Sequence, residues 1–379
     1  MWQIFVQFFT LGWVSFGGPA AHIGYFRHTF VEKRQWMSEQ QYGQIVALSQ
    51  FLPGPGSSQV GFAIGYQRGG LIGAILAFIG FTLPSVLLML TLAMFSRHWL
   101  DSALYAQLIH GLKLLAVVVV ADAAWGMYQN FCRTRLTISL CLFSAALLLF
   151  ISGLWAQIIV IGGAAILGIF KLSPASSSLD SAPFRPTWWP LFIFAGLLII
   201  LSLFATYIPY VTIFEPFFHA GSLVFGGGHV VMPLLQNVLT EQIDTDIFLT
   251  GYAAAQAVPG PMFTLATYLG YHLQPDAPII GALIATMAIF LPGFLLLLGV
   301  LKHWQTLASV PKVSGALAGV NAAVVGLLIA ALYQPVFVSA VFNNGDLALV
   351  ILGLWLLKVV KLPIIALVTF FLASSLLLS

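Results

Sequence analysis

An apolar run is interrupted by prolines and glycines over residues 49–66, SQFLPGPGSSQVGFAIGY. Proline removes a backbone donor and clashes with the preceding helical turn, and glycine disfavours continuous helix. The run therefore predicts two half-helices that meet at Pro53-Gly54-Pro55-Gly56. Within a bilayer such a break is tolerated only where protein buries it or where it lines a water-filled cavity. We interpret it as part of a translocation site, with a purely structural kink as the alternative.

The same interruption occurs in the second half of the chain, at Pro259-Gly260-Pro261. Three further motifs, and the glutamine that precedes the interruption, recur with it in the same order. The pairs are Phe16-Gly17-Gly18-Pro19 with Phe225-Gly226-Gly227-Gly228, Gln50 with Gln256 (each three residues before its Pro-Gly-Pro), Gly65-Tyr66 with Gly270-Tyr271, and Leu83-Pro84 with Leu291-Pro292. Chance does not produce such ordered agreement, so the chain is predicted to have two structurally equivalent halves.

The composition indicates a membrane protein. Hydrophobic residues make up 60% of the chain and charged residues 7%, with a mean hydropathy of +1.01, whereas about a quarter of a soluble domain is charged. The apolar runs are continuous, unlike the alternating strands of a barrel. The predicted fold is an all-α polytopic membrane protein. Its candidate segments are 4–20, 42–66, 70–96, 108–130, 136–151, 153–170, 188–208, 213–229, 247–271, 278–301, 312–334, 345–359 and 362–378.

The domain organisation follows from the repeat and from one polar stretch. The predicted parts are a first repeat, a Ser- and Pro-rich linker, a connecting transmembrane helix and a second repeat, at 1–172, 173–187, 188–208 and 209–379.

The charges of two equivalent loops favour an inverted repeat. The loop after the first Phe-Gly-Gly carries Arg27, Lys33 and Arg34, and its counterpart holds Glu241, Asp244 and Asp246. Because cytoplasmic loops collect Lys and Arg, the two loops are expected on opposite sides of the membrane. Such repeats place the substrate at their interface near the midplane. The side on which the N-terminus lies stays open.

The residues around the two breaks suit an anion. Ser57, Ser58 and Gln59 follow the first break, where a half-helix would point free N–H groups at a ligand. Gly17, Gly18, Gly226, Gly227 and Gly228 would allow close packing around the site, although glycine also serves tight helix contacts. Two facing helix N-termini supply roughly one positive charge. A dianion would therefore need a further cation or a proton.

Several side chains could supply that charge or couple transport to protons. Lys113 lies within an apolar helix, where an ionisable residue is a functional candidate, although it could instead snorkel to the interface. Its repeat counterpart is Asn321, and Asp122 lies further along the same helix. The remaining candidates are Arg27, His22 and His229.

Other classes of function lack their signatures. The net charge of +3 is spread thinly, without the basic patch that nucleic acid requires, and no GxxxxGK[ST] motif for a nucleotide occurs. HExxH, GxGD and GxSG are also missing, so we expect no enzyme. Neither a cofactor nor a metal is expected. Cys132 and Cys141, which have no CxxC spacing, are expected as small buried hydrophobes.

The motifs resemble those of the chromate ion transporter family in its long two-domain form. The resemblance covers essentially the whole chain, and its residues are Phe16 to Ile23, Val31 to Trp36, Leu52 to Pro55, Gly65 to Ala74, Phe225 to Gly228 and Pro259 to Pro261. The sequence departs from the family pattern at Gln35, where glycine is common, and after the first Pro-Gly-Pro. The resemblance implies export of chromate across the cell inner membrane by two homologous halves of opposite orientation. A homodimer in the lipid bilayer is a further expectation.

Energetics is compatible with export. Moving one charge through 100 mV is worth about 2.3 kcal/mol, so a dianion leaving a negative interior gains roughly 4–5 kcal/mol. Membrane potential, proton coupling and sulfate exchange are all open as driving forces. The alternatives are a carrier for uptake of sulfate or another oxyanion, and an anion channel.

Overall fold

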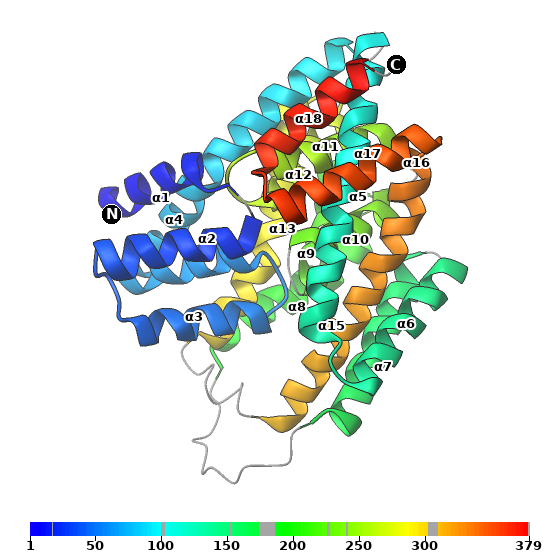
Figure 1. Ribbon diagram of the computed structural model, residues 1–379. Helices are drawn as coiled ribbons and strands as arrows, with labels where there is room; N and C mark the ends of the chain where they lie inside the picture. The colour runs from blue at the N-terminus through cyan, green and yellow to red at the C-terminus, as the bar shows by residue number, and fades with distance from the viewer. Residues whose placement is uncertain are drawn as a thin grey trace.

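The computed structural model describes residues 1–16, 18–99, 103–151, 153–173, 186–205, 207–225, 228–239, 242–301 and 310–377. All regular secondary structure in these ranges is helical (Figure 1). The first half contains α1 (Trp2–Val14), α2 (Gly18–Phe26), the π-helix η1 (Arg27–Lys33), α3 (Glu39–Phe51), α4 (Gly56–Trp99), α5 (Ala103–Phe131), α6 (Arg135–Phe150) and α7 (Leu154–Lys171). After α8 (Trp188–Phe204) come α9 (Pro209–Leu223), η2 (Gly228–Val230), α10 (Val231–Leu239), α11 (Thr245–Ala257), η3 (Met262–Thr264), α12 (Leu265–Leu273), α13 (Pro278–Val300), α15 (Pro311–Ala331), η4 (Leu332–Phe337), α16 (Val338–Ala340), α17 (Asn344–Trp355), η5 (Leu356–Val360) and α18 (Ile364–Leu377).

The helices have the length and surface of a multi-pass membrane protein. In the described ranges, four stretches are long and apolar enough to cross a bilayer, namely Gly56–Ser96, Gln107–Phe131, Pro278–Val300 and Pro311–Phe337. Large apolar side chains stand exposed on the shorter helices: Phe143 on α6 is 68% exposed, Phe170 on α7 77% and Phe192 on α8 68%. Water would oppose such a surface, whereas lipid accommodates it.

Local sequence signals explain where several helices begin. Ser38 caps α3 and forms a capping box with Gln41, and Thr134 forms the same arrangement with Thr137 at the start of α6. Helices α9, α13 and α15 each start with a proline, whose missing N–H would have no partner there in any case.

Each half contains a tight helical hairpin after its Pro-Gly-Pro. In α4 the backbone leaves helical geometry at Gly69 and Gly70, and Gly70 has a φ of +60°. The chain turns there so closely that Gly65 packs on the carbonyl of Gly73. In the second half Gly270 of α12 and Gly281 of α13 make the equivalent contact.

The two halves are interlocked rather than side by side. Helix α5 of the first half packs on α17 and α18 of the second, and α15 of the second half packs on α6 and α7 of the first. Glycines permit both approaches: Gly111 of α5 lies against the carbonyl of Phe371, and Gly319 of α15 against that of Ala164. Figure 1 shows α5 and α15 running alongside each other through the middle of the molecule, where they are also in contact.

One sequence expectation about a loop is wrong. The stretch 21–41, between the predicted segments 4–20 and 42–66, is expected as a basic loop, but it contains most of α2 and all of η1. Its counterpart after the second glycine motif forms α10. These helices are shorter than a membrane span. Their hydropathy alone therefore does not distinguish them from loops that follow a glycine motif. Of the predicted linker, residues 174–185 lie outside the described ranges.

Candidate functional site

The two Pro-Gly-Pro loops meet the opposite half of the chain at equivalent positions. Helix α3 ends at Phe51 and α4 begins at Gly56, and between them Gly54 donates its N–H to the carbonyl of Val224 at 2.7 Å. Between α11 and η3, Gly260 donates its N–H to the carbonyl of Ser15 at 2.8 Å. Ser15 and Val224 each precede a Phe-Gly-Gly motif. We call this region the crossing: Pro53–Pro55, Pro259–Pro261, Ser15 and Val224.

Both loop glycines adopt a conformation that other residues avoid. Gly54 has a φ of +120°, and a Cβ there would lie 2.8 Å from the Cα of Gly293. Gly260 has a φ of +96°, and a Cβ there would collide with the hydroxyl of Ser85. The left-handed region and the close approach both require glycine.

Side-chain hydrogen bonds hold each loop against the helix that it crosses. Gln59 donates from Nε2 to the carbonyls of Pro53 at 2.9 Å and Gly293 at 3.0 Å. For the second-half loop, Ser85 Oγ of α4 donates to the carbonyl of Pro259 at 2.6 Å. Ser85 and Gly293 each follow the proline of a Leu-Pro pair, so they occupy equivalent places in the repeat.

His22 joins the start of α4 to the crossing. Its Nε2 lies 3.1 Å from the carbonyl of Ser15, and its Nδ1 lies 3.1 Å from the hydroxyl of Ser57. A carbonyl can only accept, so Nε2 carries the proton. In the neutral ring Nδ1 then accepts from Ser57. The side chain of His22 is buried, and this contact fixes the direction in which the Ser57 hydroxyl points.

The crossing also holds buried polar atoms without partners. Within the described ranges, four buried oxygens make no hydrogen bond: Ser15 Oγ in the crossing, Ser58 Oγ and Gln59 Oε1 in the first turn of α4, and Thr82 Oγ1 three residues before Ser85. Buried polar atoms are normally satisfied by protein or by ordered water. The first turn of α4 adds backbone N–H groups that have no partner inside the helix. The crossing therefore offers unpaired oxygens and N–H groups that can hydrogen-bond a polar ligand.

The two glycine motifs converge on one methionine. Met262 lies directly after the second loop, and a Cβ at Gly18 or Gly228 would lie 3.8 Å or 3.4 Å from its sulfur. Gly17, Gly226, Gly227 and the side chain of His229 lie outside the described part of the structure. In the second half, the hydroxyl of Thr264 bonds back to Pro261 at 2.8 Å. The hydroxyls without partners therefore lie on the first-half side.

The predicted charged residues lie elsewhere and have partners. Lys113, whose side chain is 9% exposed, forms an ion pair with Asp246 at the start of α11. Asp122 forms an ion pair with Lys358. Arg27 is exposed and binds Glu32 at 2.6 Å and Glu39 at 2.8 Å. No Lys or Arg takes part in the hydrogen bonds of the crossing that the described residues make.

The remaining amide candidates also lie apart from the hydrogen bonds of the crossing. Gln50 is exposed at the end of α3. Gln256 is half-buried and bonds Tyr252. Asn321 is half-buried on α15, and its Oδ1 has no partner within the described residues.

Several residues of the crossing and its contacts lie outside the predicted motifs. Ser15 and Val224 precede the glycine motifs, and Ser85 and Gly293 follow the Leu-Pro pairs. Extending each repeated motif by one residue would have included the last two. Met262 carries no such signal, because the residue after the first Pro-Gly-Pro is Gly56.

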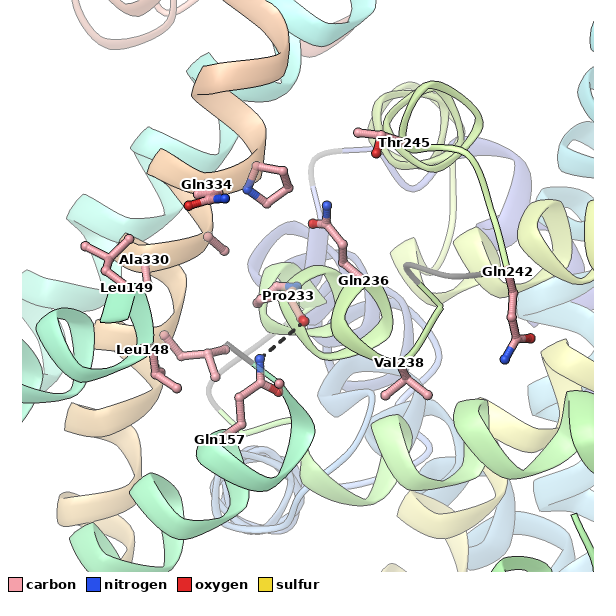
Figure 2. Close-up of a pocket in the computed structure, with 14 residues that line it drawn as sticks. Leu148, Leu149, Gln157, Pro233, Gln236, Val238, Gln242, Thr245, Ala330 and Gln334 are labelled. Atoms are coloured by element: carbon pink, nitrogen blue, oxygen red, sulfur yellow. Dashed lines mark hydrogen bonds between the residues drawn. The ribbon is translucent and has the colours of Figure 1, made fainter. Parts of the chain in front are cut away.

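A separate cavity opens between the turn of α6 and α7, helix α10 and the end of α15. It has a volume of about 720 Å³, and its polar lining consists mainly of glutamines (Figure 2). These are Gln157, Gln236, Gln242 and Gln334. None of them was singled out in the sequence, because no motif surrounds them.

Comparison with known proteins identifies the family of this chain. The chromate transporter family matches residues 2–169 and 211–377. An uncharacterized transporter of Methanocaldococcus jannaschii is 29% identical over 86% of this chain and 82% of its own length. A probable chromate transport protein of Synechococcus elongatus is 28% identical over 86% and 82%, and a chromate transport protein of Cupriavidus metallidurans is 28% identical over 86% and 80%. No solved structure matches the chain. The two matched regions correspond to the two halves that meet at the crossing, and the chain belongs to the chromate transporter family.

Proposed function

We propose that this protein is a secondary transporter that exports chromate from the cytoplasm across the cell inner membrane, with the crossing as its substrate site. The observation that carries the proposal is the reciprocal contact of the two Pro-Gly-Pro loops beside buried, unsatisfied polar atoms. The relatives named as chromate transport proteins support the substrate.

The donors at the crossing suit a tetrahedral oxyanion. The N-terminal turn of α4 offers backbone N–H groups and the positive end of a helix dipole. The Ser15 and Ser58 hydroxyls are buried without partners within the described residues and can donate to an anion oxygen. Such neutral donors recognise shape and charge, which chromate and sulfate share. We therefore expect the two anions to compete.

The chemistry of the crossing also limits how tightly a dianion is held. None of its hydrogen bonds in the described ranges comes from Lys or Arg, so among these residues no full positive charge bonds the substrate there. Binding must be weak enough for release, as rapid permeation requires. Membrane potential then suffices to drive export, with proton or sulfate exchange as an addition.

The arrangement of the halves supports an inverted repeat. Gly54 of the first half bonds the second half before its glycine motif, and Gly260 of the second half does the same to the first. Exchanged contacts of this kind relate two copies by a two-fold axis. With the opposite loop charges described above, we propose that the axis lies in the membrane plane and that the crossing lies near the midplane.

The test is chromate uptake into everted membrane vesicles. Vesicles that contain the protein should take up chromate saturably, and excess sulfate should inhibit the uptake. Collapsing the proton gradient while keeping the potential separates the two driving forces. Uptake no greater than in vesicles without the protein, with its presence verified, would contradict chromate export.

The same vesicles address the alternatives. A channel would show flux that does not saturate and is not stimulated by anion on the far side. A sulfate uptake carrier would transport sulfate into right-side-out vesicles and would leave everted vesicles without chromate accumulation.

A further inference from the structure

The glutamine-lined cavity has a composition unlike a structural void. Its volume is about 720 Å³, and Gln157, Gln236, Gln242 and Gln334 contribute amides from separate parts of the chain. Among the described residues that line it, none carries a charge, and the others are apolar or small apart from Thr245. Empty cavities in proteins are apolar, and polar ones hold water or ligands.

Gln157 is the clearest sign that this cavity takes a polar guest. Its side chain lies on α7 and is only 2% exposed. The Nε2 atom makes one long hydrogen bond, at 3.5 Å to the carbonyl of Pro233, which Figure 2 shows as a dashed line. The Oε1 atom has no partner within the described ranges. A buried amide left in this state is costly unless something else bonds it.

Two elements that line the cavity are connected along the chain to the crossing. Helix α10 follows η2, whose first residue Gly228 lies against Met262 after the second loop. At the other end Thr245 begins α11, which runs to the second Pro-Gly-Pro. A ligand in the cavity would therefore contact α10, which follows η2, and the first residue of α11, which ends before the second loop.

We infer that this cavity is a second binding station for the transported oxyanion, on the route between the crossing and one side of the membrane; the inference rests on the proposed transport function. Amides donate hydrogen bonds to an anion without holding it by a full charge. Carboxylates would repel a dianion, and several lysines would trap it. A neutral polar lining meets the requirement that a station on a route binds weakly.

Two described carboxylates flank the lining residue Thr245, and both have partners. Asp246 follows Thr245, and its carboxylate forms an ion pair with Lys113. Asp244 caps the same helix by accepting from the N–H of Asp246 at 2.7 Å. Gln334 lies on η4, directly after α15, and across the cavity from Thr245 (Figure 2), so a charge added there faces a guest without replacing a buried residue.

The first experiment places opposite charges at one position. Gln334 is exposed, so we expect Gln334→Lys and Gln334→Glu both to fold. In the vesicle assay we expect the lysine variant to lower the KM for chromate and the glutamate variant to raise it, each by about five-fold, as expected for a dianion several ångströms from one charge. The matched control is Gln129→Lys and Gln129→Glu on α5, an exposed position outside the cavity lining, where we expect no change.

The second experiment measures occupancy without transport. Ala330 lines the cavity, and Ala330→Cys adds a thiol to its wall. Cys132 and Cys141 are buried and can be replaced by serine for a clean background. We expect a membrane-impermeant thiol reagent to label Cys at position 330 from one side only and sulfate to slow that labelling several-fold, while chloride at equal ionic strength does not.

The outcomes separate this inference from the proposed function. The assignment of the cavity would be overturned if Gln334→Lys and Gln334→Glu changed the KM in the same direction. It would also be overturned if sulfate did not slow labelling at position 330. A wild-type protein that transports no chromate, together with protection by sulfate, would contradict the proposed substrate and support the cavity as an oxyanion site.

Discussion

At the scale of single residues, the loop glycines show why the motif has its form. In Pro53-Gly54-Pro55 the prolines end one helix and allow the next to begin, and Gly54 turns the backbone through a positive φ against Gly293. Gly260 does the same against Ser85. The motif and its repetition are visible in the sequence. Their partners are not, because a contact between distant helices depends on the packing of the whole chain.

We expect alanine at either loop glycine to lower the unfolding temperature and the chromate uptake, with the larger effect at Gly54. Gly54→Ala adds backbone strain of about 1–3 kcal/mol and drives a methyl group into the Cα of Gly293, which cannot move aside. At Gly260 the added methyl meets a serine hydroxyl, which can rotate at the loss of its bond to Pro259. The measurement is thermal unfolding in detergent together with chromate uptake. Gly43→Ala in α3 has open space and serves as the control; equal losses for all three would contradict the role of the loops.

At the scale of elements, one ion pair joins two helices that belong to different halves. Lys113 lies on α5, and its partner Asp246 starts α11, the helix that ends at the second loop. The side chain of Lys113 is 9% exposed and that of Asp246 56%. The sequence predicted Lys113 as a functional candidate because charge is rare in an apolar helix. Its partner could not be predicted, because many residues separate the two and no periodicity relates them.

The unequal burial of this pair gives an asymmetric prediction. Asp246→Asn leaves an ammonium group in a buried place without its counter-charge, so we expect a loss of at least about 1 kcal/mol of stability. Lys113→Met removes the charge and keeps the volume, and the remaining carboxylate is largely solvated, so the change should stay within about 1 kcal/mol.

The measurement is the unfolding temperature of both single variants and of the double variant. The double variant should resemble Lys113→Met, since the cost of Asp246→Asn disappears when no lysine is present. If Lys113→Met proves the more damaging change and also abolishes chromate uptake in folded protein, the lysine acts on the substrate and not as a tether.

At the scale of the whole molecule, the repeat predicts two equivalent halves but not how they combine. Helices α5 and α15 each pack into the opposite half, and each Pro-Gly-Pro loop bonds the residue that precedes the opposite glycine motif. A sequence repeat is equally compatible with two separate bundles. The interlocked arrangement follows from small residues such as Gly111 and Gly319, which let backbones approach. These glycines are visible in the sequence, but the helices on which they pack cannot be predicted from it.

The last prediction concerns the sides on which equivalent loops lie. In an inverted repeat, the turn at the end of η1 and the turn after α10 face opposite aqueous compartments, as their opposite charges suggest. Single cysteines at Lys33→Cys and Gln242→Cys, both exposed positions, should therefore react differently with an impermeant thiol reagent. One should be labelled in intact cells and the other only in everted vesicles. Labelling of both from the same side would mean that the halves are parallel, and the reciprocal contacts would then reflect a two-fold axis along the membrane normal.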